Sequence, residues 1–425
     1  MSSGATIGGA ARREHGALSA FARRRVCAAL AAIVEGELTI VDGEDSLRFE
    51  GERAGPRAEV VVHDARAWRA LALGGVLGGG EAYADGWWSA DDLAGVVGVL
   101  ARNAAALGGL ERGGRWRAPA LRLWHRLRDN DRAGSRRNIS AHYDLGNAFF
   151  ATFLDPTLTY SSAVFERAGA TLEEAQRAKY ERLCRKLALR PEHHLLEIGG
   201  GWGAFAIHAA REHGCRVTTT TISREQHALA QARVAAAGLG DRVEVLCRDY
   251  RDLGGSYDRV ASIEMIEAVG HRHLPRFFEV CAQRLAPDGV LALQAILVPE
   301  RDWERSKRSV EFVKRYVFPG SQLVALGAIS AAIAATDLTL THYEDITPHY
   351  AETLRRWRES FLASCARVGE LGYDERFQRT WEFYLAYCEG AFRERVNLAA
   401  QLVFEKAGAR ASSLLGTLDR PALGD

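Results

Sequence analysis

Hydrophobic and polar positions along the chain predict strands that alternate with helices. Between residues 195 and 296, short apolar runs have the length of buried strands, and the residues between them repeat at helical spacing. This order of elements indicates a parallel, Rossmann-like α/β sheet. The strands are expected at 195–198, 216–222, 243–247, 258–264 and 289–296, and the helices between them near 203–213, 223–237 and 273–285.

The N-terminal part of the chain predicts a separate, small α/β module. A helix is expected from about Leu18 to Val34, followed by three strands and a second helix from Asp64 to Leu73. The strands are expected at 37–41, 46–49 and 58–62. We therefore expect three parts, namely a small N-terminal α/β domain (1–108), a basic linker helix (109–137) and a C-terminal α/β domain (138–425).

Two segments combine basic and aromatic residues. Residues 111–137 contain nine arginines and three acids, with Trp116 and Trp124 at helical spacing. This pattern fits a helix on an anionic membrane surface as well as a linker helix that packs its tryptophans on a neighbouring domain. A second cationic helix is expected within an insertion at 299–345, where it would bind phospholipid headgroups or simply face solvent. Its basic residues are Arg301, Arg305, Lys307, Arg308, Lys314 and Arg315.

Composition narrows the class of protein. The 425 residues carry 55 basic and 54 acidic side chains, so no overall field favours nucleic acid. Seven scattered cysteines without a C-x-x-C pair suit reduced thiols in a cytoplasmic protein and argue against disulfides and a bound metal. The apolar runs after Arg25 and at 323–335 are shorter than the roughly 20 residues that span a bilayer, so no membrane span is expected.

The glycine-rich stretch 199–203 is expected to be the turn between the first strand of the sheet and its helix. Gly199, Gly201 and Ala204 fit the loose dinucleotide pattern G-x-G-x-x-[G/A]. A nicotinamide cofactor also needs an acid at the end of the second strand, but 217–223 reads VTTTTIS. The sequence therefore disfavours that cofactor, and a turn that only closes the α/β core remains an alternative.

Several ordered motifs resemble the cyclopropane-fatty-acyl-phospholipid synthase family, which includes the mycolic acid cyclopropane synthases. The resemblance covers 138–408 and implies that 138–425 is a methyltransferase domain, with a class I methyltransferase sheet and an inserted helical lid. The small N-terminal α/β domain (1–108) looks like the lipid-associated domain that full-length members of the family carry. The motifs are HYDLGN (142–147), LTYSSAVF (158–165), LEIGGGWG (196–203), TISREQ (221–226), RDYRD (248–252), SIEMIEAVG (262–270), YVFPG (316–320) and YCEGAFR (387–393).

The resemblance implies that the chain uses S-adenosylmethionine. The glycine turn and the tyrosine–serine pair would hold its methionine part, residues after the second strand its ribose, and an aspartate–tyrosine pair its adenine. The implied cofactor-binding residues are Tyr160, Ser161, Glu197, Gly199, Gly201, Thr221, Ile222, Gln226, Asp249 and Tyr250.

The resemblance also implies a reaction at a cis double bond of an acyl chain, in an apolar channel that excludes water. The alkene takes the methyl group, and a bicarbonate ion serves as the base. The residues that would hold this ion are Ser162, Glu267, Gln294, Ile296 through its backbone, and Tyr350. Two of them depart from the family pattern, because Ser162 replaces a cysteine and Gln294 replaces a histidine. Neither can carry a proton away at neutral pH.

The resulting hypothesis is a peripheral enzyme at the inner face of the cytoplasmic membrane that converts unsaturated phospholipid acyl chains to cyclopropane fatty acids. The alternative product is a methylene- or methyl-branched chain, or a furan precursor, formed without ring closure. Two further classes stay open, a lipid carrier with a decayed methyltransferase domain and a methyltransferase for small molecules or nucleic acid. A homodimer is compatible with the sequence, and no nucleic-acid partner is expected.

Overall fold

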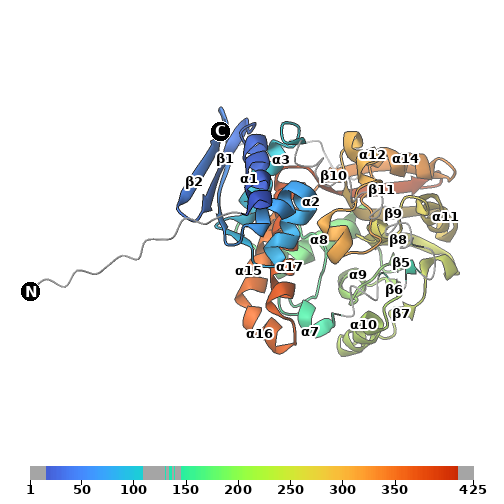
Figure 1. Cartoon of the computed structure of the whole chain (residues 1–425). Coiled ribbons are helices and arrows are strands. Elements are labelled where there is room, and N and C mark those ends of the chain that lie inside the picture. The colour runs from blue at the N-terminus through green and yellow to red at the C-terminus, as the bar shows by residue number, and fades with distance from the viewer. Residues whose placement is uncertain (1–15, 109–129, 131–133, 136–137, 139–144, 410–425) are drawn as a thin grey trace, which may run out of the picture. The chain divides into compact units, whose positions relative to one another are not determined.

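The computed structural model describes residues 16–108, 130, 134–135, 138 and 145–409. Figure 1 shows the chain, coloured by residue number from the N-terminus to the C-terminus. The chain divides into two compact units. The first contains 1–128, 308–319 and 350–397, and the second contains 129–307, 320–349 and 398–425. The first unit thus takes in two segments that the expected boundaries place in the C-terminal domain. Nearly all of the expected linker helix and the first half of HYDLGN (142–144) lie outside the described residues.

The first unit contains a mixed four-stranded sheet in the order β2-β1-β3-β4. β1 pairs antiparallel with β2 across a tight turn at Gly43, whose φ of +66° favours glycine, and parallel with β3. Alternate residues of β1 are buried, as expected for a strand with one face on a core. The strands are β1 (Glu35–Asp42), β2 (Asp45–Glu50), β3 (Arg53–Val62) and β4 (Trp88–Ala90).

Helices cover this sheet and form the rest of the first unit. α2 continues eleven residues beyond its predicted end at Leu73, with a break at Gly75. Gly80 explains part of this glycine-rich sequence, because a Cβ atom there would lie 2.6 Å from the rings of Phe312 and Phe383. The helices are α1 (Ala17–Leu30), α2 (Arg66–Ala84), α3 (Leu93–Arg102), α13 (Phe312–Tyr316), α15 (Thr347–Ala363, in this unit from Tyr350), α16 (Cys365–Glu370) and α17 (Glu375–Arg393).

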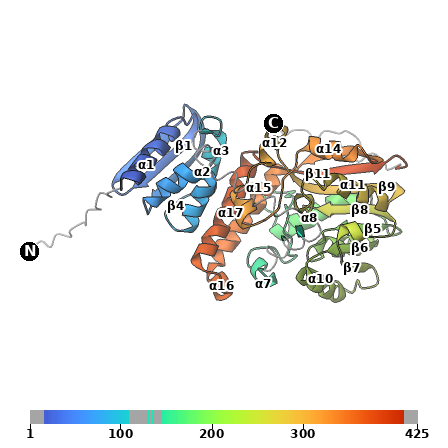
Figure 2. The same cartoon turned by 45° about the vertical axis from the view of Figure 1, so that its right-hand side comes forward.

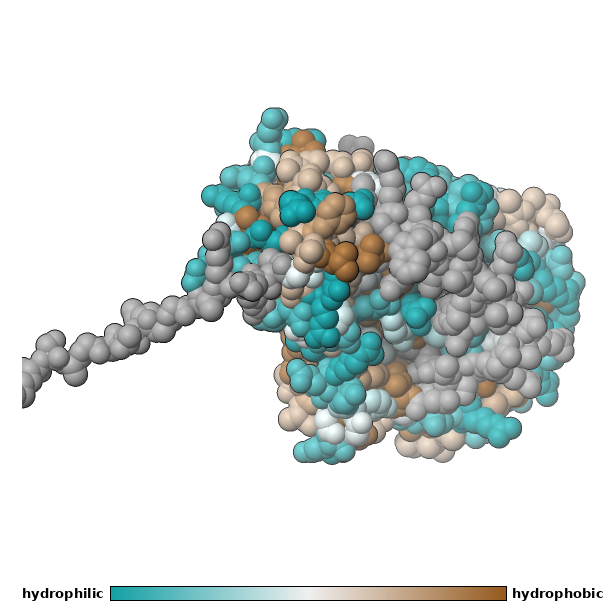
Figure 3. Space-filling model, in the orientation of Figure 1, coloured by the Kyte–Doolittle hydropathy of each residue, from teal (hydrophilic) through white to brown (hydrophobic). Residues whose placement is uncertain are grey.

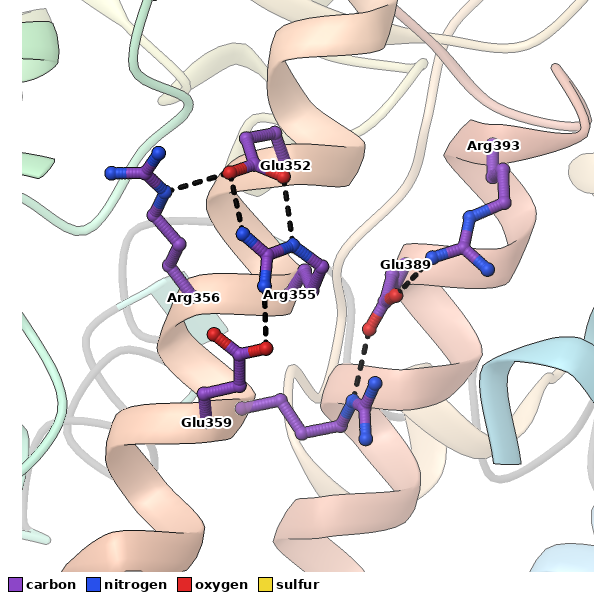
Figure 4. A network of polar contacts seen from close by, with 7 residues as sticks. Glu352, Arg355, Arg356, Glu359, Glu389 and Arg393 are labelled. Atoms are coloured by element: carbon purple, nitrogen blue, oxygen red, sulfur yellow. Dashed lines mark hydrogen bonds and ion pairs between the residues drawn. The ribbon is translucent and has the colours of Figure 1, made fainter. Parts of the chain in front are cut away.

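A buried ion pair joins the long helices α15 and α17, which lie side by side in Figure 2. Nε of Arg358 on α15 lies 2.9 Å from Oε2 of Glu389 on α17, and Arg393 binds the other oxygen of this glutamate. Glu389 is completely buried. Figure 4 shows Glu389 with Arg393, beside a second, more exposed network in which Glu352 accepts from Arg355 and Arg356.

The second unit is built on a seven-stranded sheet in the order β10-β11-β9-β8-β5-β6-β7. The strands β5, β6, β7, β8 and β9 run parallel to one another. β11 runs antiparallel to its neighbours β9 and β10. The predicted Rossmann-like α/β fold is confirmed. The strands are β5 (His194–Ile198), β6 (Arg216–Thr221), β7 (Val243–Cys247), β8 (Tyr257–Ile263), β9 (Leu285–Leu297), β10 (Leu338–Asp345) and β11 (Leu398–Lys406).

Two hydrophobic clusters fill the two faces of this sheet. One contains residues of α8, α9 and α10 together with inward residues such as Leu195 and Ala261. The other contains residues of α11 and α14 with the alternate strand positions, such as Leu196 and Val260. The helices of the unit are α7 (Asn147–Phe150), α8 (Leu172–Lys186), α9 (Ala204–His213), α10 (Arg224–Ala236), α11 (Leu274–Arg284), α12 (Trp303–Ser306) and α14 (Leu326–Ile333).

The region 299–345 differs from its prediction in two ways. It is not wholly an insertion, because β10 at its end belongs to the sheet. The single cationic helix is wrong as well, since α12 and α13 are short and separate, and Lys314 is buried with Nζ donating to the carbonyl of Ser309. Alternating charged and apolar residues at 301–315 resemble a helical stripe, but Ser309 and the β-branched Val310 interrupt it.

Among the described residues, no helix combines the length and the hydropathy needed to cross a bilayer.

Candidate functional site

The glycine turn at the carboxyl end of β5 has the backbone geometry of a ligand-binding loop. Gly199 and Gly201 have φ values of +87° and +53°, in the left-handed region that glycine enters most easily. The backbone N–H groups of Gly199 and Gly200 both donate to the carbonyl of Thr220, which fixes the loop against β6. A Cβ atom on Gly201 would meet no atom within 4 Å, so this side of the loop has room for a ligand.

A buried carboxyl group supports this loop from below. Glu197 accepts a hydrogen bond of 2.6 Å from Oγ1 of Thr219, and burial raises its pKa to about 7. A Cβ atom on Gly200 would lie 1.8 Å from Thr219 Oγ1 and 2.8 Å from Glu197 Oε2. Gly200 is therefore required by the Glu197–Thr219 pair, a constraint that the loose glycine pattern does not reveal.

The residues expected to hold the ribose of the cofactor lie at and after the end of β6. Oγ1 of Thr221 donates to Oε1 of Gln226 over 2.8 Å, and the hydroxyl of Ser223 caps α10 by accepting from the Gln226 backbone. Ile222 lies between them, half-buried. Because Thr221 takes its oxygen, Gln226 has its NH₂ group available for a hydroxyl ligand.

The residues expected to hold the adenine of the cofactor lie after β7. Asp249 is buried and accepts from both Nε and Nη2 of Arg251, at 2.8 and 2.7 Å. Arg251 also donates to the carbonyl of Asn130, which ties this loop to the preceding segment. The ring of Tyr250 lies edge-on to Phe277, and burial raises its pKa to about 12. Asp249 is thus bound to a protein cation that the sequence analysis did not single out.

The tyrosine–serine pair lies beside the glycine loop through a chain of aromatic contacts. The ring of Phe150 lies 5.2 Å from that of Trp202 in the loop and 5.3 Å from that of Tyr160. Ser161 is buried, and its Oγ accepts a hydrogen bond of 2.7 Å from Nζ of Lys179 on α8. Lys179 is completely buried, and burial lowers its pKa to about 7.

A carboxylate that the motifs did not single out lies at the end of β8. Oε1 of Glu264 accepts from the backbone N–H of Ser162 over 2.9 Å and from Nε2 of Gln294 over 2.8 Å. Glu264 has a φ of +48°, a rare conformation for a residue with a side chain. Strained backbone of this kind is concentrated at functional sites.

A second carboxyl group, Glu267, lies close by in a short 3-10 helix, η3 (Ile266–Ala268). Its Oε1 accepts from the backbone N–H of Ile296 over 2.5 Å, and its buried Oε2 has no hydrogen-bond partner among the described residues. Burial and, to a smaller degree, the charge of Glu264 raise the pKa of Glu267 to about 8. With a pKa of about 8, Glu267 is mostly protonated at neutral pH.

The structure thus brings together four of the five predicted catalytic residues. Glu267 and Ile296 form one hydrogen-bonded pair, and Ser162 and Gln294 share Glu264. The hydroxyl of Ser162 donates to the carbonyl of Ala163. Tyr350 belongs to the first unit, where its ring stacks on Phe392, so its role stays a prediction.

Three residues important to this geometry were not predicted, namely Lys179, Glu264 and Arg251. Glu264 had a usable signal, since it stands in the same apolar stretch as Glu267 and is as costly to bury without a partner. Lys179 looks like an ordinary helix residue in the sequence. Only the packing of α8 against the sheet shows that it is buried.

One cluster in the described residues has the composition of a metal site. Ligand atoms of Cys184, His208 and His213 lie within 4.8 Å of one another. Glu181 already accepts a hydrogen bond from His213, and burial raises the pKa of the Cys184 thiol. The thiol lies in the hydrophobic cluster under α8 and α9, where loss of its proton is costly, so these contacts are explained without an ion.

Comparison with known proteins shows the family of the chain. A family model described as mycolic acid cyclopropane synthetase matches residues 130–402. Tuberculostearic acid methyltransferase UfaA1 of Mycobacterium tuberculosis is 42% identical over 352 residues, which are 80% of this chain and 82% of that protein. Cyclopropane-fatty-acyl-phospholipid synthase of Escherichia coli is 33% identical over 361 residues, 82% of this chain and 88% of that protein.

A solved structure has the same fold over about two thirds of the chain. The mycolic acid cyclopropane synthase CmaA1, complexed with SAH and CTAB, aligns with a TM-score of 0.60 at 32% identity and covers 64% of this chain and 98% of that one. The glycine loop at 199–203, which is open on the side of Gly201, has room for a cofactor of this kind. The chain belongs to the mycolic acid cyclopropane synthetase family and is an S-adenosylmethionine-dependent methyltransferase that methylates or cyclopropanates lipid double bonds.

Proposed function

We propose that the chain methylates the cis double bond of an unsaturated phospholipid acyl chain and that Glu264 accepts the proton lost from the product. The observation that carries this proposal is the pair of hydrogen bonds to Glu264 from Ser162 and Gln294, two of the five residues that were expected to hold a bicarbonate ion. Two donors on one carboxylate oxygen favour its ionised form, which is the form that a general base needs.

The chemistry requires one base in a dry site. Bound S-adenosylmethionine would supply a sulfonium methyl group. The π electrons of the alkene would form the new bond to the methyl carbon, and the electron pair of the broken carbon–sulfur bond would stay on sulfur. The positive charge then lies on the acyl chain, where the anionic Glu264 stabilises it and takes the proton. Glu267, neutral at pH 7, adds no second charge that would have to be desolvated.

A bicarbonate ion does not fit the described donors well. Gln294 donates to the carbonyl of Ser162 as well as to Glu264, and its Oε1 accepts from Gln401, so its hydrogen-bonding capacity is used. The N–H of Ile296 is taken by Glu267. Among the residues expected to hold the ion, those in the second unit thus already serve the protein's own carboxylates. The proposal therefore routes no step through bicarbonate.

A methylene-branched acyl chain is the product that the site supports best. A hydride shift along the chain followed by loss of a methyl proton to Glu264 gives this product without any further reactant. UfaA1, a tuberculostearic acid methyltransferase, has the higher identity of the two relatives compared above. The cyclopropane stays the second candidate because it needs the same methyl transfer and one proton loss, and because the E. coli relative is a cyclopropane synthase.

Lipid analysis separates these products. The chain would be expressed in bacterial cells that lack their own cyclopropane synthase, and the phospholipid acyl chains would be examined by mass spectrometry and proton NMR. We expect one added carbon and vinylidene proton signals. Ring-proton signals instead would establish the cyclopropane, and the absence of any added carbon would contradict methylation of acyl chains.

A Glu264→Gln variant tests the base within the same assay. General bases typically contribute about 10²–10⁴-fold to a rate, so we expect a loss of turnover in that range with S-adenosylmethionine binding retained. The exposed Glu212→Gln on α9 is the control and should behave like the natural chain. A Glu264→Gln variant with normal turnover would remove Glu264 from the mechanism.

The first unit offers a surface for the lipid phase, and we place the enzyme at the cytoplasmic face of an anionic membrane. Leu18 and Phe21 on α1 are 72% and 55% exposed, and the next turn carries the exposed Arg24 and Arg25. Figure 3 shows hydrophobic residues gathered over the α1 and α2 region. Apolar side chains beside arginines are typical of helices that lie on anionic bilayers.

Vesicle co-sedimentation tests this surface. Leu18→Ser combined with Phe21→Ser should weaken binding to vesicles that contain phosphatidylglycerol, while Leu362→Ser, on an exposed position of α15, should not. Equal binding of the two variants would exclude α1 as the contact.

A further inference from the structure

A line of polar side chains runs from the half-buried Glu264, along the face of the sheet that packs on α8, to that helix. Nε2 of Gln294 on β9 lies 2.8 Å from Glu264 Oε1, and Nε2 of Gln401 on β11 lies 3.0 Å from Gln294 Oε1. Nζ of Lys186, the last residue of α8, lies 2.6 Å from Gln401 Oε1 and pairs with Glu344 on β10. Gln294 and Gln401 are 1% and 0% exposed.

The two glutamines interrupt a part of the sheet that is otherwise apolar. They are direct neighbours in the register of β9 and β11, and the residues on either side of them, such as Leu293 and Leu402, are buried and hydrophobic. Buried amides cost free energy unless they are fully hydrogen-bonded, so two apolar residues would pack here at lower cost. This placement therefore asks for a role beyond packing.

Lys186 gives the line a direction. An ammonium group can only donate, so Gln401 must turn its oxygen toward Lys186 and its NH₂ group toward Gln294. Gln294 must then turn its oxygen toward Gln401 and its NH₂ group toward Glu264. Without the ammonium group, the amide of Gln401 could rotate by half a turn and turn its oxygen toward the oxygen of Gln294. Gln294 would then lose the donor to its oxygen, and only the carbonyl of Ser162 and Glu264 would hold its amide.

We propose that Lys186 and Gln401 are positioning residues, which hold the amide of Gln294 in the orientation that donates to Glu264 and so keep this carboxylate ionised. The inference rests on the proposed role of Glu264 as the base. Besides the glutamine, the charged groups that interact with Glu264 include Glu267 on η3 and Lys179 on α8. Those around Lys186 are Glu344, Arg182 and His342, and Arg182 also pairs with Glu344.

The pH dependence of kcat/KM in the full-length enzyme tests the proposal. In Lys186→Met the amides of Gln401 and Gln294 are no longer held in one orientation, so Glu264 loses a hydrogen-bond donor that favours its ionised form. The acidic limb of the profile should then move to higher pH by about one unit. Lys186→Arg, which keeps a donor, should restore most of the natural profile. A purely structural role of Lys186 would lower activity at every pH without moving the limb.

Lys406→Met is the matched control. Lys406 lies on β11 as well, but its Nζ donates to the carbonyls of Ala282 and Leu285 and pairs with Asp337, away from Glu264. Its acidic limb should stay in place. Gln401→Met breaks the line at a second point while leaving the Lys186–Glu344 pair, and it should shift the limb like Lys186→Met.

The outcomes separate this inference from the function on which it rests. If Glu264→Gln is inactive while Lys186→Met and Gln401→Met keep the natural acidic limb, the positioning line is refuted and the base stands. If Glu264→Gln is active, the base is refuted whatever the lysine variants do. S-adenosylmethionine binding by calorimetry shows that each variant is folded.

Discussion

Nζ of Lys179 donates to Oγ of Ser161 over 2.7 Å, and neither side chain is open to solvent. In the proposed complex, Ser161 faces the methionine part of the cofactor, so the lysine places a positive charge behind the group that binds its carboxylate. Lys179→Met should weaken S-adenosylmethionine binding about 10- to 100-fold, the size of one hydrogen bond to a charged group. Isothermal titration calorimetry measures this loss.

The same pair predicts a pH dependence of cofactor affinity. Because burial lowers the pKa of Lys179 to about 7, the ammonium group loses its proton as the pH rises through neutrality. Affinity should therefore fall between pH 6 and 8 in the natural chain and stay flat in Lys179→Met. Arg177→Met, an exposed change on α8, is the control. A Lys179→Met variant with natural affinity would show that the lysine serves only the core.

Two neighbouring glycines should respond differently to alanine. In Gly200→Ala the new Cβ atom would lie 1.8 Å from Thr219 Oγ1, so the loop or β6 must move. Gly201→Ala meets no atom but has to hold a φ of +53°, which costs about 1–2 kcal/mol. We expect the Gly200→Ala variant to show no measurable cofactor binding. The Gly201→Ala variant should only have a modestly lower melting temperature. The reverse order would mean that the loop relaxes around Gly200.

Glu267 predicts how stability depends on pH. Its pKa is raised from 4.5 to about 8 in the folded protein, so the folded state binds a proton that the unfolded state releases above pH 4.5. The contribution of this group to the free energy of unfolding is therefore lost as the pH rises from about 4.5 to 8. Glu267→Gln, which cannot ionise, should gain stability relative to the natural chain over this window.

Thermal unfolding at pH 5 and pH 8.5 measures that difference. The melting temperature of Glu267→Gln should exceed that of the natural chain more at pH 8.5 than at pH 5. Glu225→Gln, at an exposed position of α10, should show no such change. An equal difference at both pH values would mean that Glu267 is ionised in the folded protein.

The strands of the parallel sheet were predictable because each is a short apolar run between turn signals. β10 and β11 were not predicted. β10 does alternate buried and exposed residues, as a strand with one solvent-facing side does, but it lies at the edge of the sheet beside β11, which comes far along the chain, after the helices α15 to α17. β11 pairs with β9 across about a hundred residues, and β10 joins the sheet only through β11. Pairing over such a distance is decided by tertiary packing rather than by local pattern.

The candidate site divides along the same line. Glycines with positive φ and a capping box at Thr171 are local features, and the structure contains both. Glu264, Lys186 and Gln401 act through partners on other elements, so their spacing in the sequence carries no sign of the contact. The resemblance to a family supplied the expected bicarbonate site, but only the structure shows that Glu264 occupies its donors.

The ion pair between Arg358 and Glu389 predicts a large effect on the stability of the first unit. Glu389 is completely buried and is held by Arg358 over 2.9 Å and by Arg393 over 2.5 Å. Arg358→Met leaves a buried carboxylate with one partner, and losses of this kind cost about 3–5 kcal/mol. Denaturant unfolding followed by circular dichroism should show a loss of that size.

Two further variants show whether the buried charge is the cause. Arg355→Met on the same helix removes ion pairs with Glu352 and Glu359 that are partly exposed, so it should cost no more than about 1 kcal/mol. Combining Arg358→Met with Glu389→Leu removes both charges and should recover much of the loss, because a buried pair can often be replaced by apolar residues at little cost. A double variant as unstable as Arg358→Met alone would mean that the arginine stabilises α15 through its packing rather than through Glu389.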